Sequence, residues 1–237
     1  MKRRRRATLL TLCLLLAGLT IACVLWVRAQ QRQYVLNRRL IAVLVNEDDR
    51  QALALVNAGA DPNTRYEATT APTLSELVRK FFHRSPLPGN DSPTAFMMAC
   101  GAAWLRNGQS TTGISSTDAP QLVQTMLSHG VDLTLKADGD WTPLDGALFA
   151  DHKETVRLLL AKGTWNLNAQ VDPGNLLSFT ILYSHDKELV RQLLLHGANP
   201  NLTSPGRLTP LQFAKGFGDL DIVALLEQYG AKESKHP

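Results

Sequence analysis

The chain has 237 residues, of which 44% are apolar, so it is long enough and apolar enough to bury a substantial core. The net charge of +4 is unevenly distributed: the segment from Met1 to Arg39 carries nine basic groups and no acid, whereas the rest carries 16 lysines and arginines against 21 aspartates and glutamates. Because a nucleic-acid surface requires a basic folded domain, this distribution argues against nucleic-acid binding.

The amino terminus consists of a short basic tail followed by a long apolar run. Residues 1–6 contain Lys2 and four consecutive arginines, and residues 7–27 contain no charged side chain. At a helical rise of about 1.5 Å per residue, a run of this length spans a hydrocarbon core of roughly 30 Å. The sequence therefore predicts a transmembrane signal-anchor helix over residues 7–27, followed by a linker over residues 28–39.

Basic residues lie on both sides of the apolar run, but they are denser before it. Positive charge favours retention in the cytoplasm, so we expect a cytoplasmic amino terminus and an extracytoplasmic main domain, which in a bacterium lies in the periplasm. Three alternatives remain open at this point. They are a cleaved signal peptide with Val27-Arg28-Ala29 as the cleavage site, a lipoprotein site at Cys23, and a reversed anchor that leaves the domain in the cytosol.

Beyond the linker, glycines recur at the ends of apolar runs. Gly130, Gly163, Gly197 and Gly230 follow one another at nearly equal intervals. A glycine just past the end of a helix supplies the left-handed residue that stops it. A period of about 33 residues predicts a stack of two-helix repeats, in which each unit buries its apolar face only against its neighbours.

Two copies of a Thr-Pro-Leu motif mark helix starts in this pattern. Thr142 and Thr209 lie two periods apart, and each precedes the glycine of its own repeat by the same interval. A threonine at the N-cap accepts a hydrogen bond from a free backbone amide, and proline suits the first helical position because it has no N–H to leave unpaired. Leu176-Leu177-Ser178 stands where a third copy is expected, with Leu176 in the threonine position.

The turns after the repeats are also alike. Residues 59–63 and 197–201 read Gly-Ala-Asp-Pro-Asn and Gly-Ala-Asn-Pro-Asn. Together with the Thr-Pro-Leu starts, the alanines five residues after each threonine and the Leu-Leu runs, these motifs resemble the ankyrin-repeat family over about residues 40–232. The resemblance implies an all-α solenoid of about five helix pairs with projecting turns. One transmembrane helix precedes it, and a tail over residues 233–237 follows it.

Two departures from the family pattern carry consequences. Asp145 and Gln212 replace the histidine that usually follows Thr-Pro-Leu, so its hydrogen bond must be replaced or absent. The interval between the glycines at positions 59 and 130 is slightly more than two repeat lengths. Either residues 73–83 form a partial helix pair and the Ser-Pro pair at 92–93 opens the next repeat, or residues 65–90 are simply an insertion. Both layouts leave a polar loop over residues 104–118, and such loops are usually functional or disordered.

No catalytic, cofactor-binding or metal-binding constellation is evident. The six histidines form neither HExxH nor a zinc-finger spacing with cysteine, and no P-loop, GxGxxG or GxSxG motif occurs. Three cysteines, two of them in the apolar run, exclude a disulfide framework. We therefore expect no enzymatic activity, no cofactor, no metal and no small-molecule substrate. His129 and His196 directly precede glycines, and we assign them to helix ends, where a cation is favourable.

Aromatic residues at repeat spacing are the best candidates for a binding site. Counting seven residues from the helix starts at 142 and 176 gives Phe149 and Tyr183, and Phe217 lies one position further along in the last repeat. In the ankyrin-repeat family, partner contacts commonly come from turn tips and from exposed positions late in the first helix. We therefore expect Trp141, at a turn tip, and these three residues to contact a protein partner. Packing of the three against adjacent helices is the alternative.

These features predict a membrane-anchored, non-catalytic protein-interaction module that binds a protein on the extracytoplasmic side. Two alternatives belong to other classes. The domain could be a dedicated inhibitor or protective factor for one secreted enzyme, or a cytosol-facing membrane scaffold if the anchor is reversed. Repeat surfaces vary freely while the scaffold repeats, so the sequence does not identify the partner.

Overall fold

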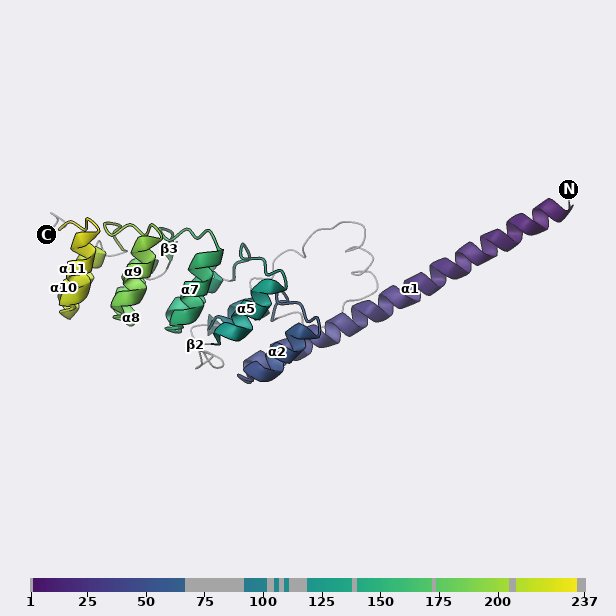
Figure 1. The fold of residues 1–237 in the computed structure, drawn as a ribbon, viewed down its shortest axis with the longest axis horizontal. Coiled ribbons are helices and arrows are strands. Elements are labelled where there is room, and N and C mark those ends of the chain that lie inside the picture. Colours follow the sequence, from purple (N-terminus) through teal and green to yellow (C-terminus); the bar gives the residue numbers. More distant parts are fainter. Residues whose placement is uncertain are drawn as a thin grey trace.

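The computed structural model describes residues 2–66, 92–101, 105–106, 109–110, 119–137, 140–171, 174–204 and 208–233; in the first helix, side chains are described from residue 15. Within these ranges the chain forms a row of short helices and one long amino-terminal helix that extends away from the row (Figure 1). The helices are α1 (Lys2–Val45), α2 (Asp49–Asn57), α4 (Ala95–Ala99), α5 (Pro120–Ser128), α6 (Pro143–Phe149), α7 (Lys153–Lys162), α8 (Leu176–Tyr183), α9 (Lys187–Leu195), α10 (Pro210–Phe217) and α11 (Leu220–Gln228).

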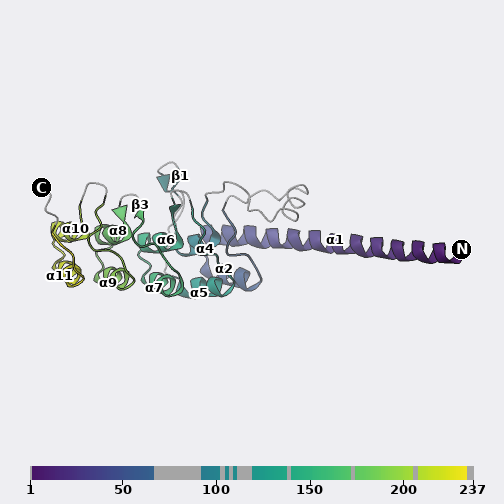
Figure 2. The ribbon, with the colours of Figure 1, turned by 90° about the horizontal axis from the view of Figure 1, so that it is seen from above.

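The short helices form two rows, which Figure 2 shows from above. The end of α1 lies in one row with α4, α6, α8 and α10, and the second row contains α2, α5, α7, α9 and α11. Each first helix packs against the second helix of its own pair and against the first helices of the neighbouring pairs. In the described part of the chain the prediction of about five stacked helix pairs is therefore confirmed, and α1/α2 and α4/α5 are direct neighbours in the stack.

Two short antiparallel ladders project from the turns. Strand β1 (Leu105–Arg106) pairs with β2 (Gln109–Ser110), and β3 (Gln170–Val171) pairs with β4 (Gly174–Asn175). The first ladder falls within the predicted loop 104–118, whose remaining residues lie outside the described ranges. Residues 67–91 and 234–237 also lie outside them, so the choice between the two layouts of the predicted 65–90 insertion stays untested.

The threonine caps are confirmed, and they explain the loss of the family histidine. Thr142 accepts from the backbone N–H of Asp145 at 3.3 Å, and the Asp145 carboxylate accepts in return from the Thr142 N–H at 2.6 Å. Thr209 and Gln212 make the same reciprocal pair in the last repeat. Burial raises the pKa of Asp145, against the lowering effect of its hydrogen bonds from Thr142. A capping box thus supplies the hydrogen bonds at both helix starts.

Two helices begin at a different residue from the predicted one. The N-cap of α8 is Asn175, whose side chain accepts from the N–H of Ser178 at 2.9 Å. Asn175, rather than Leu176, therefore occupies the threonine position, because only a polar side chain can accept from the free amide. Likewise α4 is capped by Thr94, which accepts from the N–H of Met97 at 3.2 Å, and not by the Ser-Pro pair before it.

The left-handed glycine predicted at the end of each second helix occurs at four of the five ends: Gly59, Gly130, Gly197 and Gly230. The prediction is wrong at Gly163, whose backbone is extended, with φ −111° and ψ 159°. Here the turn has one extra residue, and the Trp165 indole N–H donates to the carbonyl of Leu159 at 2.7 Å. A Cβ at position 163 would lie 2.6 Å from the Trp165 ring, so close approach of the indole explains this glycine.

Asparagines in the turns connect neighbouring repeats. The Asn63 side chain donates to the carbonyl of Gly130 at 3.0 Å and accepts from the N–H of Asp132 at 2.8 Å. The corresponding contacts further along the stack are made by Asn168 and Asn201. Between the second and third helix pairs, Thr134 takes the place of the asparagine, and it bonds to Asp132 within its own turn. The turns thus form a ladder that sets the spacing of the helix pairs.

Replacing Asn201 with alanine is expected to lower the free energy of unfolding by about 1–2 kcal/mol, because the carbonyl of Gly230 and the N–H of Lys232 lose their partner. Urea denaturation of the full-length protein, followed by circular dichroism, measures this change. Asn46→Ala is the matched control, since the Asn46 side chain donates to the carbonyl of Ala42, four residues earlier at the end of α1, at 2.9 Å, and the loss of this bond should cost less than about 0.5 kcal/mol. Equal losses in the two variants would contradict the inter-repeat role.

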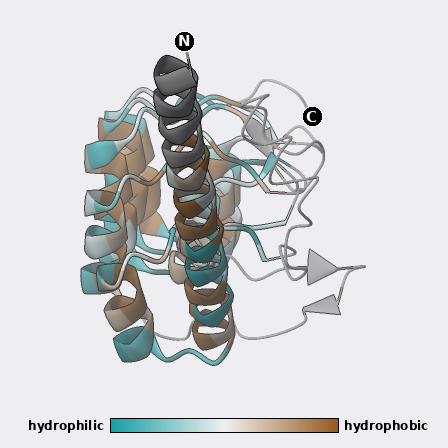
Figure 3. Cartoon of the chain, turned by 90° about the vertical axis from the view of Figure 1, so that its right-hand side faces the viewer, coloured by the Kyte–Doolittle hydropathy of each residue, from teal (hydrophilic) through white to brown (hydrophobic). Residues whose placement is uncertain are grey.

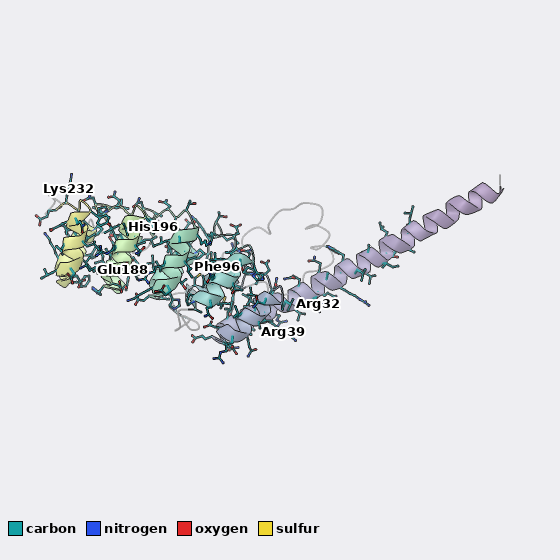
Figure 4. All side chains as sticks on the ribbon, viewed as in Figure 1. Arg32, Arg39, Phe96, Glu188, His196 and Lys232 are labelled. Carbon is teal, nitrogen blue, oxygen red and sulfur yellow. The ribbon has the colours of Figure 1, made fainter. Side chains whose placement is uncertain are left out.

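The apolar core lies between the two helix rows. Figure 3 shows hydrophilic residues on the outer side of the second row and hydrophobic residues on the side that faces the rest of the chain. Phe96 of α4 is buried within the stack, whereas Arg32 and Arg39 are exposed on α1 (Figure 4). Each of the helices after α1 is too short to be stable by itself, so burial between the rows provides most of its stability.

The predicted anchor and the predicted linker both lie within α1, which continues without a break into the first helix pair. The side chains of residues 2–14 lie outside the described part. Among the helices of the described residues, none combines the length and the apolarity needed to cross a membrane. Several large apolar side chains near the middle of α1 are nevertheless more than half exposed: Leu15, Leu16, Leu19, Ile21, Val24 and Leu25.

Candidate functional site

Four aromatic side chains from α6, α8 and the turn before α6 gather at one place in the first-helix row. The ring centroid of Phe149 lies 5.8 Å from that of Trp141, 5.8 Å from that of Phe179 and 6.4 Å from that of Tyr183. The rings of Phe179 and Tyr183 are 4.6 Å apart. We call Trp141, Phe149, Phe179 and Tyr183 the aromatic cluster. Three of the four residues predicted to bind a partner are thus brought together.

The local sequence explains why these rings meet. Trp141 directly precedes the N-cap of α6 and Phe149 is the last residue of that helix, which is short enough for the two rings to meet edge to face. Phe179 and Tyr183 are four residues apart on α8 and therefore share one face of it. Because α6 and α8 are neighbours in the row, the two pairs of rings face each other. Two adjacent repeats are required to build the cluster.

The cluster has a buried base and an exposed edge. Phe179 is only 6% exposed, Trp141 and Phe149 are half-buried, and Tyr183 is 57% exposed. Phe179 was not among the predicted residues, although its spacing of four residues from Tyr183 is visible in the sequence. The same spacing recurs in the next repeat, with Phe213 and Phe217. The buried ring of Phe179 packs against the exposed ring of Tyr183.

Phe217, the fourth predicted residue, does not join the cluster. Its ring meets that of His185 edge to face at 4.7 Å, and it is 49% exposed. His185 Nδ1 lies 2.7 Å from a carboxylate oxygen of Asp219, so this contact links the last two repeats. With Asn175 as the cap of α8, Tyr183 and Phe217 lie eight residues after their caps, whereas Phe149 lies seven after its own. Phe149 therefore does not occupy the same position in its repeat as Tyr183 and Phe217 do in theirs.

Charged side chains surround the aromatic cluster. The carboxylate of Asp140, next to Trp141, is 81% exposed and lies 3.2 Å from Lys136 Nζ. At the other end of α6, the Asp151 carboxylate accepts from the Ser184 hydroxyl at 2.6 Å. Both aspartates have left-handed backbones, with φ 63° and 56°. The cluster thus lies between two exposed carboxylates held by turns.

An ion pair between Lys153 and Asp186 connects the third and fourth helix pairs. Asp186 also caps α9, where it accepts from the N–H groups of Glu188 and Leu189 at 2.7 and 3.0 Å. Partial burial raises the pKa of Asp186, but the hydrogen bonds from Lys153 and from these two amides outweigh burial, so the pKa lies below its usual value of 3.8. The same hydrogen bond raises the pKa of Lys153.

Asp186→Asn is expected to lower the free energy of unfolding by about 1–2 kcal/mol near pH 7, since it removes the ion pair and weakens the cap. Because the pKa of Asp186 is lowered in the folded state, its contribution is present above 3.8 and is lost as the pH falls through the folded value. The difference in the free energy of unfolding between wild type and variant should therefore shrink at about pH 4 and below. Denaturation curves at several pH values measure it. A difference that grows on acidification would contradict this assignment.

The two histidines predicted at helix ends occupy those positions. His129 and His196 are the C-cap residues of α5 and α9, and their Nδ1 atoms lie 2.9 and 2.8 Å from carbonyl oxygens of Thr125 and Gln192. Across the ranges for which the structure gives side chains, no three His, Cys, Asp or Glu residues are grouped closely enough to hold a metal ion.

No protein-family model matches the chain. The sequence is similar to the ankyrin repeat, SAM and basic leucine zipper domain-containing protein 1 of several mammals. It is 30% identical to that of Dasypus novemcinctus over 115 residues, 47% of this chain and 24% of that protein. It is 33% identical to that of Homo sapiens over 108 residues, which are 44% of this chain and 22% of that protein. It is 27% identical to that of Eulemur macaco macaco over 178 residues, which are 73% of this chain and 33% of that protein. The chain therefore spans a third or less of the length of these relatives. Their similarity at modest identity and the stacked helix pairs together support an ankyrin-repeat family for this chain.

Proposed function

We propose that this chain is a non-catalytic protein-interaction module of the ankyrin-repeat type, anchored in a membrane by the amino-terminal part of α1. The aromatic cluster contacts a protein partner on the extracytoplasmic side. The observation that carries this proposal is the convergence of four rings from two adjacent repeats, with Tyr183 more than half exposed. Aromatic side chains are the commonest anchors of protein interfaces because they bury a large area. The similarity to ankyrin-repeat proteins supports the same class of function.

The surroundings of the cluster suit an extended partner. The strands β1 and β3 lie on the same side of the stack as the first-helix row, as Figure 2 shows. Figure 1 shows β2 and β3 at opposite ends of the helices, so the surface that several repeats share is that of the first helices. A solenoid binds through such a shared surface because each repeat contacts only its neighbours. The partner would therefore contact more than one repeat.

Two features of α1 support the membrane anchor. Its apolar side chains from Leu15 to Leu25 are largely exposed, and a run of this kind is stable in contact with lipid or with another apolar surface. The sequence places five basic residues before the uncharged run and four after it, which favours a cytoplasmic amino terminus. Resistance to alkaline carbonate extraction tests the anchor, and a reporter fused to the carboxyl terminus tests the side. A reporter active only in the cytosol would favour the membrane scaffold instead.

Site-specific photocrosslinking in intact membranes tests partner binding. A benzoylphenylalanine at position 183 should capture one protein reproducibly. The matched control is the same group at position 195, because Leu195 is similarly exposed, at 59%, but lies at the end of α9 in the second-helix row. Equal capture at both positions, or none at either, would reject the aromatic cluster as the binding surface. Capture of a secreted enzyme whose activity then changes would favour the inhibitor or protective version.

A further inference from the structure

We propose that the aromatic cluster recognises an arginine side chain of the partner, flanked by apolar residues. This inference rests on the proposed function, because it requires that the cluster contacts a protein. It adds the chemistry of the side chain that is recognised. Three features of this surface favour arginine: the exposed ring, the carboxylates near it and the charge balance of the surrounding turns.

The first step concerns the rings. Tyr183 is the outermost ring, and Phe179 and Phe149 hold it from two sides, with centroids at 4.6 and 6.4 Å. A ring that is already held loses little freedom when a partner covers it. The face of an aromatic ring carries negative potential and attracts cations within about 6 Å of its centroid. Arginine suits such a site best because its planar guanidinium stacks on the ring and is weakly hydrated.

The second step concerns the carboxylates. Asp151 follows Phe149 by two residues and bonds to Ser184, the neighbour of Tyr183, at 2.6 Å. The Asp151 carboxylate therefore lies where the ends of α6 and α8 meet, and Phe149 and Tyr183 are the last residues of these two helices. A guanidinium group has five N–H donors, so it can stack on a ring and donate to a carboxylate at the same time. Asp140 offers a second carboxylate next to Trp141.

The third step concerns charge balance. The nearby cations are matched by carboxylates: Lys136 by Asp140 and Lys153 by Asp186. The Asp151 carboxylate accepts from a neutral hydroxyl, and Lys153, whose pKa Asp151 also helps to raise, is hydrogen-bonded to Asp186. The chain after residue 39 is also acidic, with 21 acids against 16 bases. A basic side chain complements this surface, and an acidic one would be repelled.

Selection of a randomised phage-displayed peptide library on the full-length protein in detergent micelles tests the inference. Wild type should select peptides with an arginine at one position. Asp151→Asn and Tyr183→Ser should reduce that enrichment by about tenfold, the loss expected for roughly 1.4 kcal/mol. The matched controls are Asp221→Asn, an exposed carboxylate paired with Lys187 at 3.2 Å, and Phe217→Ser, an exposed ring outside the cluster. Both should leave the enrichment unchanged.

A fluorescence titration with one selected peptide then separates arginine recognition from simple charge. Replacing its arginine by lysine should weaken binding about fivefold or more, because lysine cannot stack and donate together. Selected peptides that depend on Tyr183 but contain no arginine would overturn this inference and leave the proposed function standing. Peptides whose selection is unchanged in the Tyr183→Ser variant would overturn the proposed function itself. Circular dichroism of each variant confirms that a loss of binding is not a loss of fold.

Discussion

Replacing Gly101 with alanine is expected to lower the free energy of unfolding by roughly 3 kcal/mol or more. Gly101 follows the end of α4 and has a left-handed backbone, with φ 101°. A Cβ at this position would lie 2.5 Å from the Cβ of Ala150 and 3.1 Å from the imidazole of His152. The substitution therefore adds a clash with the next repeat to the cost of the left-handed backbone.

Gly197→Ala is the matched control for this prediction. Its backbone is almost the same, with φ 94°, but no atom lies within 4 Å of the Cβ that would be added. It should cost only the backbone penalty, about 1–2 kcal/mol. Chemical denaturation of the two variants measures the difference directly. Equal losses would show that the turn after α4 can move away from α6 and that the two repeats are loosely packed there.

The double variant Phe149→Ser, Tyr183→Ser should abolish recovery of the partner in a pull-down from solubilised membranes. Truncation of a central aromatic anchor typically costs at least about 2 kcal/mol, so the loss of two corresponds to a fall in affinity of several hundredfold or more. Tyr183 is exposed, and its replacement removes little buried area. The helical circular dichroism signal should therefore persist at ambient temperature.

Phe217→Ser provides the control for that experiment. Its ring contacts His185 and is not one of the four rings of the cluster, so we expect a much smaller effect on partner recovery. A collapse of the helical signal in the double variant would show that Phe149 and Tyr183 act chiefly as core residues. An unchanged pull-down in a folded double variant would exclude the aromatic cluster from the interface.

The repeat architecture was readable from the sequence because its signals are local. Thr142 and Thr209 cap helices through contacts three residues away, and His129 and His196 lie at helix ends one residue before a glycine. Such features depend on the backbone within a single turn of helix. Their recurrence at a fixed period was enough to predict helix pairs and their stacking.

The candidate site was predicted only in part, because its composition depends on register between repeats. Taking Leu176 instead of Asn175 as the cap gave Tyr183 the same position in its repeat as Phe149, whereas with Asn175 as the cap it shares the position of Phe217. Phe179 was overlooked because a buried aromatic on a helix looks like any core residue until its neighbours are known. Its contacts with Phe149 and Tyr183 arise only where α6 meets α8.

By itself, the sequence determined the helix pairs, their period and the threonine caps of α6 and α10, since these follow from hydrogen bonds and backbone conformations within a few residues. Only the tertiary structure decided which rings share a surface, why Gly163 is extended and how Asn63 and Asn201 join neighbouring repeats. The physical reason is that each of these outcomes depends on the packing of side chains and turns against one another, which the local sequence pattern does not specify. One extra residue in a turn, as at Trp165, is enough to change the local geometry without disturbing the period.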